Sequence, residues 1–177
     1  ATRYPSAERS AVVISRFYTV SFKATTLPAT NAFDLFEIIP ADDKPVIFHG
    51  LKIAQAGTAD FGDAQEEGIP IQIIRVPATV TSGSGGSTPT ARLVSATGTA
   101  FGGAVEAANT TVATSSGTIE ELEAWTWNVR IPETYFVVPE FRYEFVQGSA
   151  LVVRFSVGAA DAITSLFNAT LFIEEIG

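Results

Sequence analysis

Apolar side chains recur at every second position in short runs along this chain, and no segment repeats them at helical spacing over ten residues or more. The clearest run is 120–131, where Trp125, Trp127, Val129 and Ile131 share one face of an extended strand. Residues 69–76 are dense in isoleucine and valine, whose branched side chains fit a pleated, half-buried surface. These patterns predict a chain built from β-strands.

Turn-forming residues separate the predicted strands. The strands cover residues 16–24, 32–40, 45–56, 69–76, 120–131, 135–139, 141–148, 150–158 and 166–177, and one short strand is expected within 91–98. We expect residues 99–118 to be a loop with one edge strand near 110–113, and Gly148–Ser149 to form a two-residue hairpin connection. The expected fold is all-β: a single-domain β-sandwich, jelly-roll-like, with long Gly/Ser/Thr-rich loops. An immunoglobulin-like sandwich is the alternative, although the chain lacks the Cys–Trp–Cys framework.

Two loops and one terminal segment interrupt this pattern. Residues 1–15 show no periodicity before Ala11 and are interpreted as an N-terminal arm, so that residues 16–177 form the sandwich domain. Residues 57–68 form an exposed acidic loop between two strong strands. Residues 77–91 are rich in Gly and Ser and are expected to be flexible, because they bury little apolar area.

The composition excludes several classes of function. The 177 residues contain no cysteine, which rules out disulfides and thiolate metal sites. A net charge of −8 argues against a nucleic-acid binder, which needs a basic face. No apolar run is long enough for a membrane helix or a signal peptide, and Ala1 is small enough to follow a removed initiator Met, so we expect synthesis in the host cytoplasm. Charged residues make up only 17% of the chain, which favours a surface that is partly covered by partners.

Local motifs give no catalytic constellation. Asp60-Phe61-Gly62 matches a kinase string, but it stands without the other kinase motifs. The acidic set Asp60, Asp63, Glu66 and Glu67 misses the spacing of a calcium loop and is interpreted as a solvated loop, with a cation as the open alternative. His49 is the only histidine and has no nucleophile partner in sequence, so a structural or surface role is favoured.

The remaining candidates have simpler interpretations. The run 83–86 is neither a nucleophile elbow nor a phosphate cradle. Neighbouring carboxylates, at 120–123 and 174–175, do not form a glycosidase pair, because adjacent strand residues point to opposite faces. Trp125 and Trp127 are either a sugar-stacking platform or core, and core is favoured because the apolar face continues beyond them. The sequons at Asn109 and Asn168 carry little information without a secretory signal.

Several strings together resemble a widespread group of small tailed-phage virion proteins. They are KPxxxxGLxIxQ at 44–55, GDAQEE at 62–67, IxIIR at 71–75, TSGSGGSTPT at 81–90 and the terminal LFIEEIG at 171–177. The specific strings fall within residues 33–92 and 166–177, and the strand 125–131 matches more loosely. The resemblance implies a capsid decoration (cement) protein, commonly a β-sandwich that assembles as a homotrimer on the head shell of the phage particle.

The expected function is therefore structural and non-enzymatic. The expected partners are the major capsid protein and copies of the chain itself, with no nucleic acid, no membrane, no cofactor, no metal and no catalytic residue. The arm 1–15 is expected to reach a neighbouring subunit, and loops 57–68 and 79–91 to face solvent or the adjacent copy. The alternative is the receptor- or carbohydrate-binding head of a phage fibre or spike, with the tryptophan pair and the acidic loops as its site.

Overall fold

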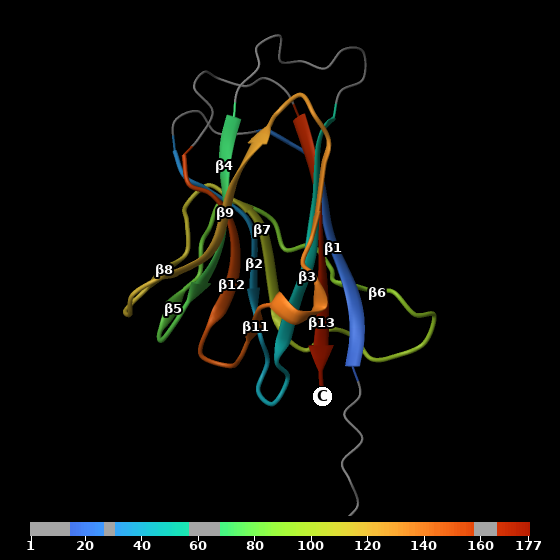
Figure 1. Cartoon of the computed structure of the whole chain (residues 1–177). Coiled ribbons are helices and arrows are strands. Elements are labelled where there is room, and N and C mark those ends of the chain that lie inside the picture. The colour runs from blue at the N-terminus through green and yellow to red at the C-terminus, as the bar shows by residue number, and fades with distance from the viewer. Residues whose placement is uncertain (1–14, 27–30, 57–67, 158–165) are drawn as a thin grey trace, which may run out of the picture.

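The chain forms two antiparallel sheets that pack face to face as a β-sandwich (Figure 1). The computed structural model describes residues 15–26, 31–56, 68–157 and 166–177. Within those ranges the only helical element is the 3₁₀ turn η1, Pro139–Phe141. The prediction of an all-β sandwich is confirmed, and the jelly-roll type stays a prediction.

The first sheet has the order β10-β3-β13-β1-β6, with β11 also paired to β3. Its strands are β1 (Ser15–Thr26), β3 (Val46–Ala56), β6 (Arg92–Leu93), β10 (Glu133–Phe136), β11 (Glu144–Phe145) and β13 (Leu166–Ile176). The centre of this sheet is the long C-terminal strand β13, which pairs with β1 on one side and β3 on the other.

The second sheet has the order β7-β2-β12-β4-β9. Its strands are β2 (Phe33–Ile39), β4 (Gly68–Val76), β7 (Ala104–Asn109), β9 (Glu120–Asn128) and β12 (Ala150–Phe155). A separate two-stranded ribbon pairs β5 (Val80–Thr81) with β8 (Thr114–Ser115). In Figure 1 this ribbon lies on the side of the second sheet that faces away from the first.

Aromatic and branched side chains fill the space between the sheets. Phe155 stacks on Trp127 with ring centroids 6.0 Å apart, and both rings are almost fully buried. Strand β13 shows why the pattern predicted this core, since its burial alternates strictly along all of its residues. In β1 one of the two alternating faces, Tyr18, Val20 and Phe22, is buried.

Strand β2 departs from the predicted alternation, because Phe33 through Ile38 are all buried. A register shift at Leu35 lets Asp34 and Glu37 face the same side, where they bond the chain at and beside the β5–β8 ribbon. A small second apolar cluster lies under the same cover; it consists of Ile74, Val76, Ala113, Ala150 and Val152. The ribbon thus forms a partial third layer on the second sheet.

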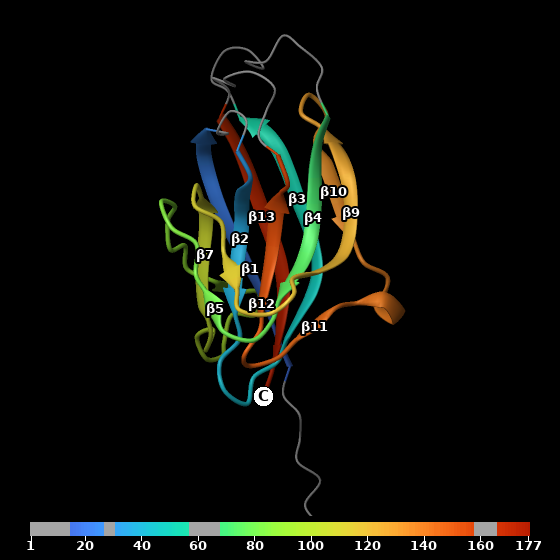
Figure 2. The ribbon, with the colours of Figure 1, turned by 90° about the vertical axis from the view of Figure 1, so that its left-hand side faces the viewer.

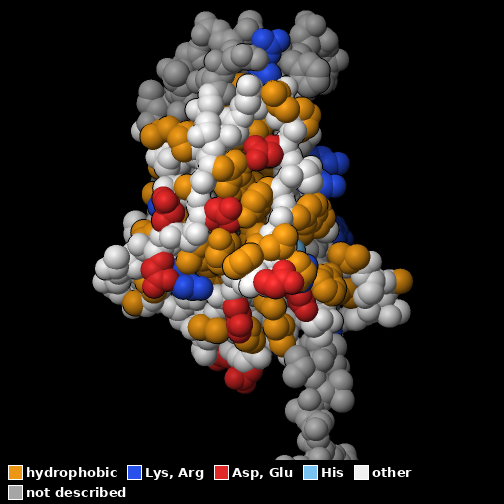
Figure 3. Space-filling model, in the orientation of Figure 1, with side chains coloured by type: hydrophobic (Ala, Val, Ile, Leu, Met, Phe, Trp, Pro, Cys, Tyr) orange, Lys and Arg blue, Asp and Glu red, His pale blue; other side chains and the backbone are white. Residues whose placement is uncertain are grey.

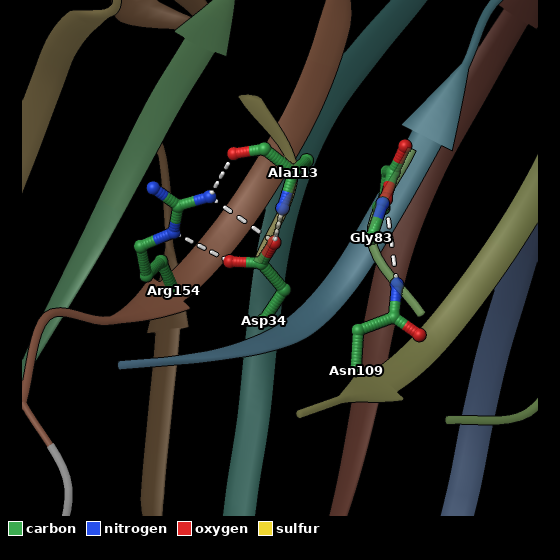
Figure 4. A network of polar contacts seen from close by, with 6 residues as sticks. Asp34, Gly83, Asn109, Ala113 and Arg154 are labelled. Atoms are coloured by element: carbon green, nitrogen blue, oxygen red, sulfur yellow. Dashed lines mark hydrogen bonds and ion pairs between the residues drawn. The ribbon is translucent and has the colours of Figure 1, made fainter. Parts of the chain in front are cut away.

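Hydrogen bonds and an ion pair formed by residues of β2 hold this third layer in place (Figure 4). Asp34 accepts a hydrogen bond from Arg154 Nε at 2.5 Å and one from the Ala113 amide at 2.6 Å. Arg154 also donates to the Ala113 carbonyl at 2.8 Å. Burial raises the pKa of Asp34, and the Arg154 guanidinium opposes that rise.

A second set of bonds centres on Glu37 and corrects the prediction of a flexible Gly/Ser segment. The Glu37 carboxylate accepts from the Ser82 hydroxyl at 2.8 Å and from the Gly83 amide at 2.9 Å. Further along, Ser84 pairs with Thr111 and Ser87 with Ala107 through backbone bonds of 2.8–2.9 Å. Hydrogen bonds to the buried Glu37 carboxylate and to the chain at and after β7 order this segment. Its low apolar content gave no sign of these hydrogen bonds.

Two further predictions in this region were wrong. The predicted strand 141–148 is reduced to β11, because Pro139 opens a 3₁₀ turn and the following residues diverge from the sheet. The Gly148–Ser149 turn exists, with Gly148 at φ +80°, but it connects β11 of the first sheet to β12 of the second. It is therefore a crossing between sheets and not a hairpin.

The edge strand expected near 110–113 is displaced. Strand β7 occupies Ala104–Asn109 and pairs with β2, whereas 110–113 lies between β7 and β8. Alanine has low strand propensity, which hid β7 in the sequence, yet its small side chains pack closely against β2.

Candidate functional site

The outer face of the first sheet carries an apolar hollow of about 430 Å³. Its walls are the side chains of Phe17, Val94, Phe136 and Phe172, which come from β1, the end of β6, β10 and β13. His49 lies at the floor and Arg142 lines the same hollow. Phe17, Val94 and Phe136 are 46%, 64% and 52% exposed, which is unusual for such large apolar side chains on one face.

Two local features of β3 create the hollow. The pairing of β3 with β13 slips by one residue at His49, because Phe172 pairs with Gly50 and Ile173 with Phe48. This β-bulge leaves His49 as the extra residue in the strand. Gly50 then lets β10 approach, since a Cβ atom there would lie 2.4 Å from both the Tyr135 carbonyl oxygen and the Phe136 ring.

The floor of the hollow is a hydrogen-bonded His–Glu pair. His49 Nε2 lies 2.7 Å from Glu174 Oε2, and the imidazole packs edge-on against Phe17. Burial lowers the pKa of His49; the bond to Glu174 opposes this effect and nearby Arg142 adds to it. The imidazole is therefore neutral at pH 7 and donates its Nε2–H to the carboxylate. No serine or threonine hydroxyl bonds this imidazole within the described ranges, so the pair lacks the geometry of a Ser–His–acid triad.

Cations surround the hollow. Lys52 lies over the Phe172 ring, with its ammonium 5.6 Å from the ring centroid, and Arg92 pairs across the sheet with Thr19 of the hollow. Lys52, Arg92 and Arg142 are all exposed. None of them forms an ion pair with another described residue. On a chain with net charge −8, this face is a local basic region, and we call it the aromatic–cationic face.

A second hollow of about 430 Å³ lies beside the first, and Phe136 lines both. Tyr143 donates to Glu123 Oε2 at 2.9 Å, and Tyr135 donates to the same oxygen. Burial and the bonded Glu123 carboxylate raise the pKa of Tyr135 far above its ordinary value, so this phenol stays protonated. Phe141, at 70% exposed, completes the wall.

A projecting turn contributes residues to both hollows, Arg142 to the first and Val138 and Phe141 to the second. Residues 138–142 leave the sheet between β10 and β11, and in Figure 2 this turn stands out from the body of the sandwich. Backbone bonds of 3.0 Å hold both of its ends to neighbouring residues of β3, Val137 to His49 and Tyr143 to Phe48. Figure 3, which views the molecule from the side on which the turn projects, shows apolar side chains and carboxylates gathered around η1 and β11.

The sequence-predicted tryptophan pair does not form a platform. Trp127 is buried, and its Nε1–H donates to the Ile131 carbonyl at 2.8 Å. Trp125 is half-buried and stacks on Tyr135 with centroids 4.6 Å apart. The predicted apolar face holds through Val129, whereas Ile131 is 57% exposed beyond the end of β9. The core interpretation is confirmed for Trp127 and Val129.

Other candidates fall in different places. The acidic set at 60–67, including Asp60-Phe61-Gly62, lies outside the described residues, as do residues 1–14 of the predicted arm; Ser15 belongs to β1. Asn109 is buried and bonds Glu37 and Glu106, which leaves its amide closed to glycosylation in the folded chain. Asn168 lies within the paired strand β13.

Among the residues that the structure describes, no group of three or more His, Cys, Asp or Glu side chains is arranged to hold a metal ion. The described part of the chain also contains no helix long and apolar enough to span a membrane.

The residues of the candidate site that the sequence did not indicate are the aromatic side chains on the outer face of the first sheet. Phe17, Phe136 and Phe172 alternate with buried residues, and that pattern alone does not tell which face meets solvent. No family model, no curated protein and no solved structure matches this chain.

Proposed function

We propose that this chain is a non-enzymatic structural subunit that works by adhesion, and that it is a decoration protein on the head of a tailed-phage particle. The aromatic–cationic face is the observation that carries the proposal. Exposed aromatic side chains beside cations that form no ion pair with another described residue are typical of a protein interface, where aromatics and arginine are enriched. The sequence resemblance at 44–55 and 81–90 supports a place on a phage particle, with the major capsid protein and other copies of the chain as partners.

The proposal is tested by adding purified chain to shells that lack it and measuring occupancy by co-sedimentation. We expect Phe17→Ser combined with Phe172→Ser to lower occupancy at least tenfold, because both rings leave the hollow. Val157→Ser is the matched control, since Val157 is 50% exposed and lies outside both hollows. Equal occupancy of the double variant and the control, with folding unchanged by circular dichroism, would refute the adhesive role of this face.

The proposed arm has its own test. A chain that begins at Ser15 retains all of β1. If residues 1–14 reach a neighbouring subunit, the shortened chain will occupy fewer sites on the shell. Unchanged occupancy would remove the arm from the proposal.

The second hollow favours one alternative, a carbohydrate- or receptor-binding head. A carboxylate flanked by tyrosine hydroxyls and exposed aromatic rings offers hydrogen bonds to sugar hydroxyls and faces for stacking. Glycan-array binding that is lost in Phe141→Ala or Trp125→Ala, with shell occupancy unchanged, would favour this alternative.

A further inference from the structure

The projecting turn has the complementary chemistry to the aromatic–cationic face. Val138 and Phe141 are 54% and 70% exposed at its tip, so they form an apolar knob. Glu140 lies within η1, Arg142 follows it, Glu144 begins β11, and all three are exposed. None of the three forms an ion pair within the described ranges. The knob thus has an apolar tip with two carboxylates and the Arg142 guanidinium beside it, whereas Lys52 and Arg92 lie beside a hollow that is apolar inside.

The knob is also held rigidly enough to act as one piece. Its two ends bond to adjacent residues of β3, and Phe141 N–H donates to the Val138 carbonyl at 3.0 Å inside the turn. A preformed turn loses little conformational entropy when it docks. Its position next to the hollow on the same chain excludes insertion into its own hollow without breaking the bonds to His49 and Phe48.

We propose that the hollow of one copy receives the knob of a second copy. Val138 and Phe141 of the incoming chain then pack among Phe17, Phe136 and Phe172, and Glu140 meets Lys52 at the rim. The contact joins two different surfaces, so repeating it from copy to copy gives a ring when the rotation between copies closes, and under the proposed function that ring is a homotrimer. This inference rests on the proposed adhesive function and names the partner for its surface.

The test uses sedimentation velocity on the purified full-length chain without shells, at low and high salt. We expect an oligomer whose association weakens roughly 30-fold or more in Phe141→Ser, the range seen when an aromatic hot spot is truncated. Val157→Ser is again the control, because it removes a similar exposed apolar side chain elsewhere.

A charge exchange identifies the contact itself. Lys52→Glu and Glu140→Lys should each weaken association, because each places like charges at the rim. Both changes in one chain restore opposite charges, and association should recover. A wild-type chain that sediments as a monomer, or a double variant weaker than either single variant, would overturn the inference.

The same proteins separate this inference from the proposed function. A chain that oligomerises as described but does not bind shells keeps the knob contact and refutes the decoration role. A monomer that binds shells refutes the knob contact and keeps the decoration role.

Discussion

Replacing Arg154 with methionine tests whether the buried ion pair holds the third layer on the sandwich. The substitution keeps a long unbranched side chain but removes the guanidinium that binds Asp34 and the Ala113 carbonyl. Asp34 is fully buried, and only the Ala113 amide would still bond it among the described residues. Leaving a buried charge without its partner costs about 3–5 kcal/mol. For a chain of this size, that loss corresponds to a fall in Tm of roughly 6–20 °C.

The pH dependence of that loss has a definite sign. Burial already raises the pKa of Asp34, and removal of Arg154 takes away the charge that opposes the rise. A carboxyl whose pKa is raised in the folded state stabilises the fold most at low pH. This stabilisation is lost as the pH rises through the pKa of the folded state. The variant should therefore be nearest to wild type in acid and should fall further behind as the pH approaches 7.

Guanidinium unfolding at pH 4.5 and pH 7 measures both effects. Asp34→Asn combined with Arg154→Met removes the unpaired charge while an amide oxygen can still accept from Ala113, so it should recover part of the lost stability at pH 7. A loss below about 1 kcal/mol in the single variant, the level of an exposed ion pair, would refute this account. So would a double variant no more stable than the single one.

Three further outcomes follow from the geometry. Glu37→Ala leaves the Gly83 amide without its acceptor, so stability should fall by about 1–3 kcal/mol and amide hydrogen exchange should speed up across 82–87. Unchanged protection of these amides would show that Glu37 does not hold the segment in place. Gly50→Ala should cost about 1–3 kcal/mol, because its Cβ collides with the Tyr135 carbonyl, and a neutral result would show that β10 moves freely. Because its pKa is lowered in the folded state, His49 stabilises the fold above about pH 6.5. This stabilisation is lost as the pH falls toward the pKa of the folded state. His49→Gln should remove that part of the slope, and since the chain has one histidine, an identical slope in both proteins would exclude it as the source.

The sequence predicted the long strands well, because their own residues determine them. Strand β13 alternates without interruption, and its partners β1 and β3 follow the same rhythm. The failures occur where a distant segment decides the outcome. The pattern placed Asp34 and Glu37 on opposite faces of their strand, whereas the chain folded over β2 buries both of them. In 141–148, aromatic and charged residues alternate as in a strand, yet only β11 pairs with β3.

The candidate site was the least predictable part. The hollow needs a bulge at His49 and a glycine at 50 opposite a phenylalanine from β10, and these meet only when three strands are in register. The tryptophans that drew attention in the sequence belong to the core or stack beside the second hollow.

The anchoring of residues 138–142 has a consequence for how such a protein can diversify. Both ends of the excursion are attached to consecutive residues of one strand, so its length and composition are decoupled from the register of every other strand. Insertions or exchanges there leave the sandwich untouched while replacing the outermost contact residues. The protein can thus acquire a new binding specificity through changes in residues 138–142 alone. Sequence libraries confined to these residues would select binders of new partners while the sandwich stays folded.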